Sequence, residues 1–416
     1  MKKNKESKFQ EELRKGFEKK RDESLPEEDR KEIRYKKLES VFTQIGNNKN
    51  KYIFYCPDIP FASTIVSTIY EQAFLLQEAG YNTLVLHDEK GFKPNWLTED
   101  YVKKVKVDYL TEKNTSATKI PEYKFNPTDT IIVPESFWSI MQNFAGNKTI
   151  NKVVLAFGYG GFATDDIGID FSMLGFHNVI CLSEQIKNDY QAIWPHLTYH
   201  VCSYTINTEK FSPLEKTERQ PTIGLSIKSR SDAAVILNLF RNKYPYFGFF
   251  DFRILKKLTL DQYAESLKEC SLLVHMDEKD GYPKPVLEAI ACDVPVLTIK
   301  SRNLSHLSSH SQVIQAYSTD WFEIVDLIAE FCVSYLEAET ISNLDKEYIN
   351  NNHSKEFVTS CLLKTVSILQ EDRVKFFSAV KTAIDEGKLD AIVLDSFEIQ
   401  TLGEFTETEV KQAVKQ

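Results

Sequence analysis

The chain has 416 residues, of which 42% are hydrophobic and 12% aromatic, enough apolar material for the cores of two or three domains and too much for a mainly disordered chain. Its 60 acidic and 51 basic side chains give a formal net charge of −9, which excludes a polycation built to coat nucleic acid. The first 40 residues differ, because they carry 14 Lys or Arg and 11 Asp or Glu, a net charge of +3.

Residues 1–45 are expected to form a charged extension that is helical in part, with a break at Pro26. One interpretation is a solvated helix or a partly disordered tail. The other is a docking arm for a peripheral membrane contact, a polyanion or a protein partner. The sequence leaves both open.

The cysteines are scattered singly, without a CxxC pair, and an odd number without a pairing framework is typical of a reducing compartment. The first residues lack the apolar core of a signal peptide, and no apolar run reaches the roughly 18 residues of a membrane span. We therefore expect a cytoplasmic protein. The cysteines are Cys56, Cys181, Cys202, Cys270, Cys292, Cys332 and Cys361.

An apolar, β-favouring run opens the first organised unit at 51–56, and a helix is predicted at 63–80, with Ser63 as N-cap and Gly80 as its end. Apolar strands that alternate with helices are typical of a parallel sheet covered on both faces. We assign this unit to an N-terminal Rossmann-like domain at 46–205. Further strands are predicted at 82–88, 106–110, 129–135, 152–157 and 178–183.

A polar linker is predicted at 206–220, and the alternation of strands and helices then restarts. The fold class is therefore α/β, with two Rossmann-like domains facing across a cleft that lies outside the carboxyl ends of their strands. The second domain is assigned to 221–370 and a helical tail to 371–416. Strands are predicted at 221–227, 247–255, 271–276, 294–299 and 390–397, and helices at 231–244, 259–270 (with a Thr259/Gln262 capping box), 285–292, 318–332 and 354–370.

The stretch DGYPKPVLEAIACDVPVL (280–297) follows a buried strand and opens a helix at Pro285. Glu288 then lies near free backbone N–H groups and the positive end of the helix dipole. Such a helix start can receive a phosphate, and carboxylates beside it suit the hydroxyls of a sugar or ribose. The alternative is that Glu288 only complements the dipole and Asp280 is a turn residue.

This stretch resembles the signature of the retaining GT-B glycosyltransferases, a large group that contains many bacterial glycan-building enzymes. Two acids separated by seven residues are followed in register by the group's Ala-x-Ala-Cys-x-x-Pro-Val pattern. INTEKFSP (206–213) and LDQYAESLKECSLLVH (260–275) are also similar, so the resemblance spans roughly residues 178–330. The matching residues are Asp280, Gly281, Tyr282, Pro285, Glu288, Ala289, Ala291, Cys292, Pro295 and Val296.

The resemblance implies a metal-independent enzyme that transfers a sugar from a nucleotide-diphosphate donor with retention, without a resident cofactor. Glu288 would hold the ribose, Asp280 the sugar hydroxyls, and Lys228 and Arg230 the departing diphosphate. A UDP- or GDP-linked sugar is the expected donor, and the acceptor stays open between a glycan, a lipid-linked sugar and a modified DNA base. The implied donor-binding residues are Lys228, Arg230, Asp280, Gly281, Tyr282, Lys284 and Glu288.

The chain departs from the group's pattern in three places. Pro283 stands where glycine is usual and Lys284 where an apolar residue is usual; the loop PDIPFAS lacks paired glycines; and SRNLSHLSSH replaces a Gly-rich turn. These departures keep a second hypothesis open, a catalytically degenerate GT-B domain that acts as a binding or assembly module. A third hypothesis, an epimerase of the same fold, would need an acid/base pair that the sequence does not locate.

Other patterns are weaker. FGYGGF (157–162) follows a strand, so its glycines can line the cleft from the acceptor side together with Ser63, although a flexible turn is the alternative. Asp165 and Asp166 hint at a metal, but no third ligand is spaced to complete a site. His87 and His275 end strands and are expected to be core or turn residues. The glycines are Gly158, Gly160 and Gly161.

Overall fold

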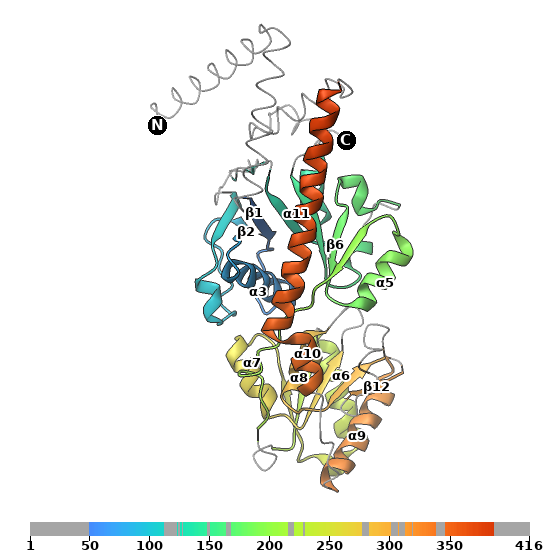
Figure 1. Cartoon of the computed structure of the whole chain (residues 1–416). Helices are drawn as coiled ribbons and strands as arrows, with labels where there is room; N and C mark the ends of the chain where they lie inside the picture. The colour runs from blue at the N-terminus through green and yellow to red at the C-terminus, as the bar shows by residue number, and fades with distance from the viewer. Residues whose placement is uncertain are drawn as a thin grey trace, which may run out of the picture.

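Two parallel β-sheets, each flanked by helices, make up the body of the molecule in the computed structural model (Figure 1). The predicted extension at 1–45, the strand at 390–397 and the predicted residues Lys228, Asp280, Gly281 and Tyr282 lie outside the residues that the structure describes. Those are residues 50–111, 123, 125–126, 128–147, 150–163, 168–214, 220–227, 229–276, 283–300, 307, 313–317, 319–337 and 346–386.

The first sheet has seven strands in the order β3-β2-β1-β4-β5-β6-β7. Its order reverses between β1 and β4, which lie side by side although two strands separate them in the chain. The strands are β1 (Lys51–Tyr55), β2 (Asn82–Glu89), β3 (Val107–Thr111), β4 (Thr130–Pro134), β5 (Asn151–Ala156), β6 (Asn178–Cys181) and β7 (Thr198–Val201). The helices are α3 (Thr64–Glu78), α4 (Trp138–Phe144) and α5 (Glu184–Ile193), with 3₁₀ turns η1 (Asp100–Lys103), η2 (Gly160–Phe162) and η3 (Phe171–Leu174).

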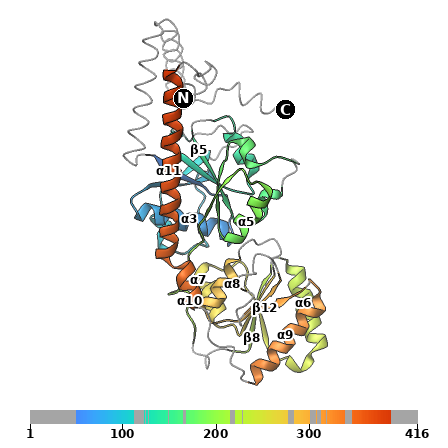
Figure 2. The same cartoon turned by 45° about the vertical axis from the view of Figure 1, so that its right-hand side comes forward.

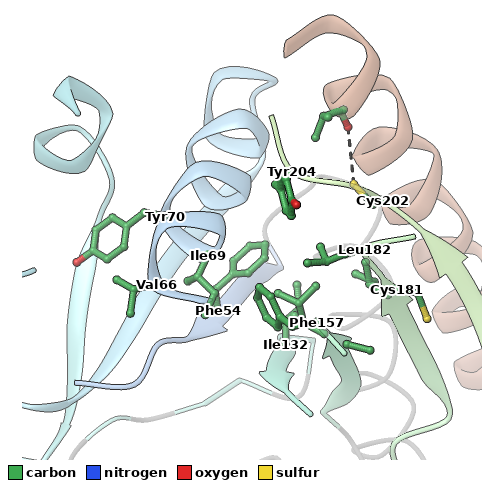
Figure 3. Packing of buried hydrophobic residues seen from close by; sticks show 14 of the residues in the cluster. Phe54, Val66, Ile69, Tyr70, Ile132, Phe157, Cys181, Leu182, Cys202 and Tyr204 are labelled. Atoms are coloured by element: carbon green, nitrogen blue, oxygen red, sulfur yellow. Dashed lines mark hydrogen bonds between the residues drawn. The ribbon is translucent and has the colours of Figure 1, made fainter. Parts of the chain in front are cut away.

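Helix α3 begins and ends where the sequence predicts. Ser63 occupies the N-cap position, although its side chain makes no capping hydrogen bond, and Gly80 takes a positive φ of 90° just after the helix. Val66 and Ile69 of α3 pack toward Phe54 of β1 and Ile132 of β4 in the core of the first domain (Figure 3). Burial of these apolar side chains is the main force that holds α3 on the sheet.

The second sheet has five strands in the order β12-β11-β10-β8-β9, and its order reverses between β8 and β10. The predicted capping box is confirmed, because Thr259 and Gln262 cap α7 reciprocally. The strands are β8 (Thr222–Ile227), β9 (Asp251–Ile254), β10 (Leu272–Met276), β11 (Val296–Ile299) and β12 (Val313–Ala316). The helices are α6 (Arg230–Lys243), η5 (Pro245–Phe247), α7 (Leu260–Lys268), α8 (Lys284–Ala291) and α9 (Trp321–Leu336).

The strand predicted at 247–255 is wrong in its first half. Pro245 opens the 3₁₀ turn η5, and the N–H of Gly248 bonds to the Pro245 carbonyl, so β9 begins only at Asp251. The aromatic run that suggested a strand instead packs into a cluster, in which the Phe247 and Phe250 rings meet edge to face at 6.1 Å.

The chain returns from the second domain to the first through α10 (Lys346–His353) and α11 (Lys355–Asp385). Helix α10 contacts α8, whereas α11 lies along α3 of the first domain (Figures 1 and 2). The thiol of Cys202 donates to the Val358 carbonyl at 3.8 Å, drawn as a dashed line in Figure 3. Helix α11 runs continuously through residue 370, so the predicted boundary there falls inside one helix that packs on the first domain.

None of the helices in the described part of the chain is both long enough and apolar enough to cross a membrane.

Candidate functional site

A cleft of about 1490 Å³ lies between the two domains and is lined by both. It opens at the carboxyl ends of the strands where each sheet reverses its order, the position at which α/β sheets bind ligands. On the first domain the segment after β1, including Phe61 and Ser63, and the segment after β4 line it. On the second domain Ser226 of β8, His275 of β10 and Glu288 of α8 line it.

The ends of β8 and β10 form the second-domain part of this cleft. The two strands pair in parallel up to Ile227 and Met276, and the Ser226 hydroxyl lies 3.2 Å from Nδ1 of His275. Residue 228 and residues 277–282 follow these paired ends directly in the sequence. His275 is buried, with 5% of its surface exposed, as expected for a core histidine, and it also lines the cleft.

Glu288 lies on α8 and is buried, with 4% of its surface exposed. Burial, which disfavours the ionised carboxylate, raises the pKa of Glu288 from 4.5 to about 7. The positive charge of Lys284 opposes this rise most strongly, while the negative charge of Glu71 adds to it. The helix begins at Lys284, so Glu288 stands on its fifth residue rather than in the first turn proper.

Lys284 connects the two domains. Its Nζ lies 3.9 Å from Oε2 of Glu71 on α3, and it stands over the ring of Tyr204, 5.2 Å from the centroid. Glu71 is itself buried and accepts hydrogen bonds from the Thr205 hydroxyl and, at 3.1 Å, from the Thr205 N–H. Lys284, which stands where the GT-B pattern has an apolar residue, is therefore the cation of an ion pair between the two domains.

The remaining predicted residues are distributed over both domains. Ser63, Gly158 and Gly160 line the cleft, whereas Gly161 lies buried behind it. Arg230 is the first residue of α6, is exposed, and is not among the described residues that line the cleft.

Glu135 is a cleft residue that the sequence does not reveal. It follows β4, and its carboxylate accepts the N–H groups of Phe157 at 2.9 Å and Gly158 at 3.1 Å. Burial raises the pKa of Glu135 from 4.5 to about 7, against the lowering effect of these hydrogen bonds. The only sequence signal is a glutamate at the end of an apolar strand. Glu135 thus fixes the FGYGGF segment that forms one wall.

The glycines of that segment allow close packing. A Cβ on Gly161 would come within 2.5 Å of the Tyr190 hydroxyl and 2.7 Å of the Phe171 ring, both fully buried. A Cβ on Gly160 would come within 3.0 Å of Ser136 and 3.1 Å of the Glu135 carboxylate. The turn is therefore a packed structure in which larger side chains do not fit.

Gly161→Ala is expected to destabilise the protein by about 1–3 kcal/mol, because the added methyl group overpacks a closed core. Gly146→Ala is the matched control, since Gly146 is exposed and an added Cβ there meets nothing within 4 Å. Urea unfolding curves of both variants measure the difference. Equal midpoints for the two variants would contradict the packing role assigned to Gly161.

The charges on the two walls differ. Among the described residues that line the cleft, those of 50–201 include three carboxylates and no Lys or Arg, whereas those of 220–300 include three lysines and one carboxylate, Glu288. Glu209 of the linker and Lys355 and Glu356 of α11 complete the charged lining. Lys256 and Lys257, in the exposed segment between β9 and α7, are further cleft residues that the sequence does not single out. The carboxylates are Glu71, Glu99 and Glu135, and the lysines are Lys256, Lys257 and Lys284.

His87 and the pair Asp165 and Asp166, which the sequence also singles out, form no functional site within the residues that the structure describes. His87 is fully buried, with its ring between Asp58 and the Tyr70 hydroxyl, each 2.9 Å away, as expected for a core histidine. Asp165 and Asp166 lie outside the described ranges. Within those ranges, no three His, Cys, Asp or Glu side chains are arranged to hold a metal ion.

No protein-family model and no curated protein sequence matches this chain. Solved structures do match it over most of its length. Sucrose-phosphate synthase from Thermosynechococcus elongatus matches with 12% identity and a TM-score of 0.55, covering 79% of this chain and 100% of the other. A glycosyltransferase from Rickettsia africae matches with 12% identity and a TM-score of 0.52, covering 77% and 98%. HepE from Anabaena, solved in complex with UDP, matches with 10% identity and a TM-score of 0.53, covering 76% and 99%.

At such low identities the likeness shows the fold alone. The predicted α/β class and the predicted arrangement, two Rossmann-like domains facing across a cleft, are confirmed: the chain has the GT-B fold.

Proposed function

We propose that this GT-B chain is a glycosyltransferase that moves a sugar from a nucleotide-diphosphate donor to a hydroxyl-bearing acceptor with retention of configuration. The observation that carries the proposal is the cleft between the domains, which Glu288 lines from the fifth residue of α8, beside the reversal point of the second sheet. Solved proteins of the same fold include HepE in complex with UDP and with UDP-glucose.

In the proposed arrangement the donor binds to the second-domain wall. Glu288 would accept hydrogen bonds from the ribose, and Asp280 from the transferred sugar. The cations on this wall, Lys256 and Lys257, would attract the diphosphate and stabilise the charge that develops as it departs. Lys228, which follows β8 in the sequence, would add to them, whereas Arg230, at the exposed start of α6, would need a movement of that segment to reach the diphosphate. Catalysis would rest on positioning and on this electrostatic stabilisation, without a dedicated base.

The acceptor is placed on the first-domain wall, and we infer that it is an uncharged carbohydrate. Carboxylates accept hydrogen bonds from sugar hydroxyls and repel phosphates, which argues against DNA and other polyanions as acceptors. Aromatic rings offer apolar faces for the C–H faces of a sugar, and Phe61 at the mouth is 60% exposed. The aromatic residues of 50–201 that line the cleft are Phe61, Phe74, Trp96, Tyr101, Phe157, Tyr159 and Phe162.

A two-stage experiment tests the proposal. In the first stage, thermal unfolding is followed with UDP-, GDP-, ADP- and CDP-sugars. A donor present at 100 times its dissociation constant is expected to stabilise the protein by about 2.7 kcal/mol. A panel without any shift would refute the donor site. In the second stage, the donor that binds is incubated with neutral oligosaccharides and, separately, with DNA that carries hydroxylated bases. Product on the oligosaccharides, with the anomeric configuration of the donor, is the expected result.

The second hypothesis, a degenerate GT-B binding module, predicts a different outcome. Such a module would show no turnover of any donor, with or without acceptor. The third, an epimerase, predicts turnover of the donor in the absence of any acceptor. Glu288 favours the transferase, because it lines the cleft as a buried carboxylate whose desolvation is costly and, within the described residues, no backbone N–H groups hold it as they hold Glu135.

A further inference from the structure

Resting on the proposed function, we propose that Lys284 and Glu71 are positioning residues that control the charge state of Glu288. Lys284 favours the ionised carboxylate and Glu71 disfavours it. Because these two residues belong to different domains, the ability of Glu288 to accept the ribose hydroxyls of a donor depends on contact between the domains. Neither residue needs to touch the donor. Lys284 belongs to the second domain and Glu71 to the first, so the pair exists only while α8 and α3 face each other.

Lys284 interacts with two carboxylates. Lys284 and Glu288 stand four residues apart on α8 and therefore share one face of the helix. Lys284 Nζ also lies 3.9 Å from Glu71, which Thr205 holds through its N–H and hydroxyl. All three charged side chains line the cleft, and Glu71 and Glu288 are buried. Their mutual electrostatic effects are therefore only weakly screened by solvent.

The groups that face Glu288 in the described part of the chain come from five elements. Lys284 of α8 and His275 of β10 favour the carboxylate, as does the hydroxyl of Tyr263 on α7. The negative charge of Glu71 on α3 disfavours the ionised form of Glu288. Tyr101 of η1 lies close enough to interact with the charges of Glu71 and Glu288. With the pKa of Glu288 raised to about 7 by burial, small changes among these neighbours decide whether it is ionised at neutral pH.

The inference predicts opposite effects of two substitutions. Lys284→Met removes the compensating cation, so the pH below which UDP-glucose binding is lost should rise by about one unit or more. Glu71→Gln removes a like charge, so that pH should fall. Lys284→Arg keeps the charge and should stay near the wild-type profile. UDP-glucose is the suitable probe because its diphosphate, esterified at both ends, does not titrate near neutral pH.

The measurement is the dissociation constant of UDP-glucose from about pH 5.5 to 8.5 for the wild type and the three variants. A purely structural role of the ion pair predicts that Lys284→Met and Glu71→Gln change affinity in the same direction at every pH. That result, or unchanged profiles in both variants, would overturn the inference. If the wild type binds neither UDP-glucose nor any other nucleotide sugar, the proposed function itself fails.

A ligand-free measurement decides the inference even in that case. The folded-state pKa of Glu288 lies above its ordinary value, so the stability falls as pH rises toward 7 and levels off above it. In Lys284→Met the fall in melting temperature should continue to higher pH than in the wild type, and in Glu71→Gln it should end at lower pH. Identical curves for the two variants would contradict the proposed control of Glu288.

Discussion

Glu288→Ala is expected to reduce glycosyl transfer by about 100-fold or more, while the protein stays folded. A carboxylate that accepts two ribose hydroxyls contributes about 1.5–3 kcal/mol for each charge-assisted hydrogen bond. Because each 1.36 kcal/mol is a factor of ten in rate, losing both reduces kcat/KM by two to four orders of magnitude. Steady-state kinetics with the donor found in the thermal panel measure the loss.

The stability of a Glu288 variant distinguishes a functional role of this residue from a structural one. The ionised carboxylate of Glu288 destabilises the folded state, so Glu288→Gln is expected to raise the free energy of unfolding near pH 8, by up to about 3 kcal/mol. Glu184→Gln is the matched control, because this carboxylate is 66% exposed on α5. Its loss should leave the rate unchanged and lower the stability by no more than about 1 kcal/mol, through its exposed ion pair with Lys187 and its place in the first turn of the helix. Full activity of Glu288→Ala would remove the ribose-binding role.

Leu362→Ala is expected to destabilise the protein by about 2–5 kcal/mol. Leu362 lies on α11 and is only 1% exposed, within the core that includes α3 and the first sheet. Removing most of its side chain leaves a cavity between the last helix and the first domain, because the surrounding side chains relax only in part. Denaturant unfolding measures the change.

Val374→Ala is the control on the same helix. Val374 is 41% exposed, so its truncation should change stability by no more than about 0.5 kcal/mol. If both substitutions were equally mild, α11 would not contribute to the stability of the first domain, contrary to its position along α3 (Figures 1 and 2).

Central strands could be predicted from the sequence because their apolar runs are continuous. The strand predicted at 129–135 is β4, every residue of which is buried, and the run at 51–56 is β1. The edge strands β7 and β12 have four residues each and are only partly buried, so the sequence carries no such signal for them and does not predict them. The packing partner of α11 was missed as well, because an amphipathic helix does not specify which sheet it covers.

The candidate site could be predicted only where it is local in sequence. The strand, loop and helix that present Glu288 lie within one short stretch, and its acidic pattern pointed to the cleft. The contact between Lys284 and Glu71 joins residues more than 200 positions apart, and nothing near either of them indicates the other. Glu135 likewise depends on the neighbouring strand β5, whose end supplies its hydrogen-bond donors.

The two chain crossings between the domains constrain their motion. The chain leaves the first domain after β7 and returns to it through α10 and α11, and Lys210 in the first crossing pairs with Glu99 of the first domain and with Asp261 of the second. Two bodies joined at two points rotate most easily about the line through both points, so opening and closing of the cleft should follow a single axis. A protein cut once in the 206–220 linker should keep its two fragments together, because α11 belongs to the second fragment and packs on the first domain.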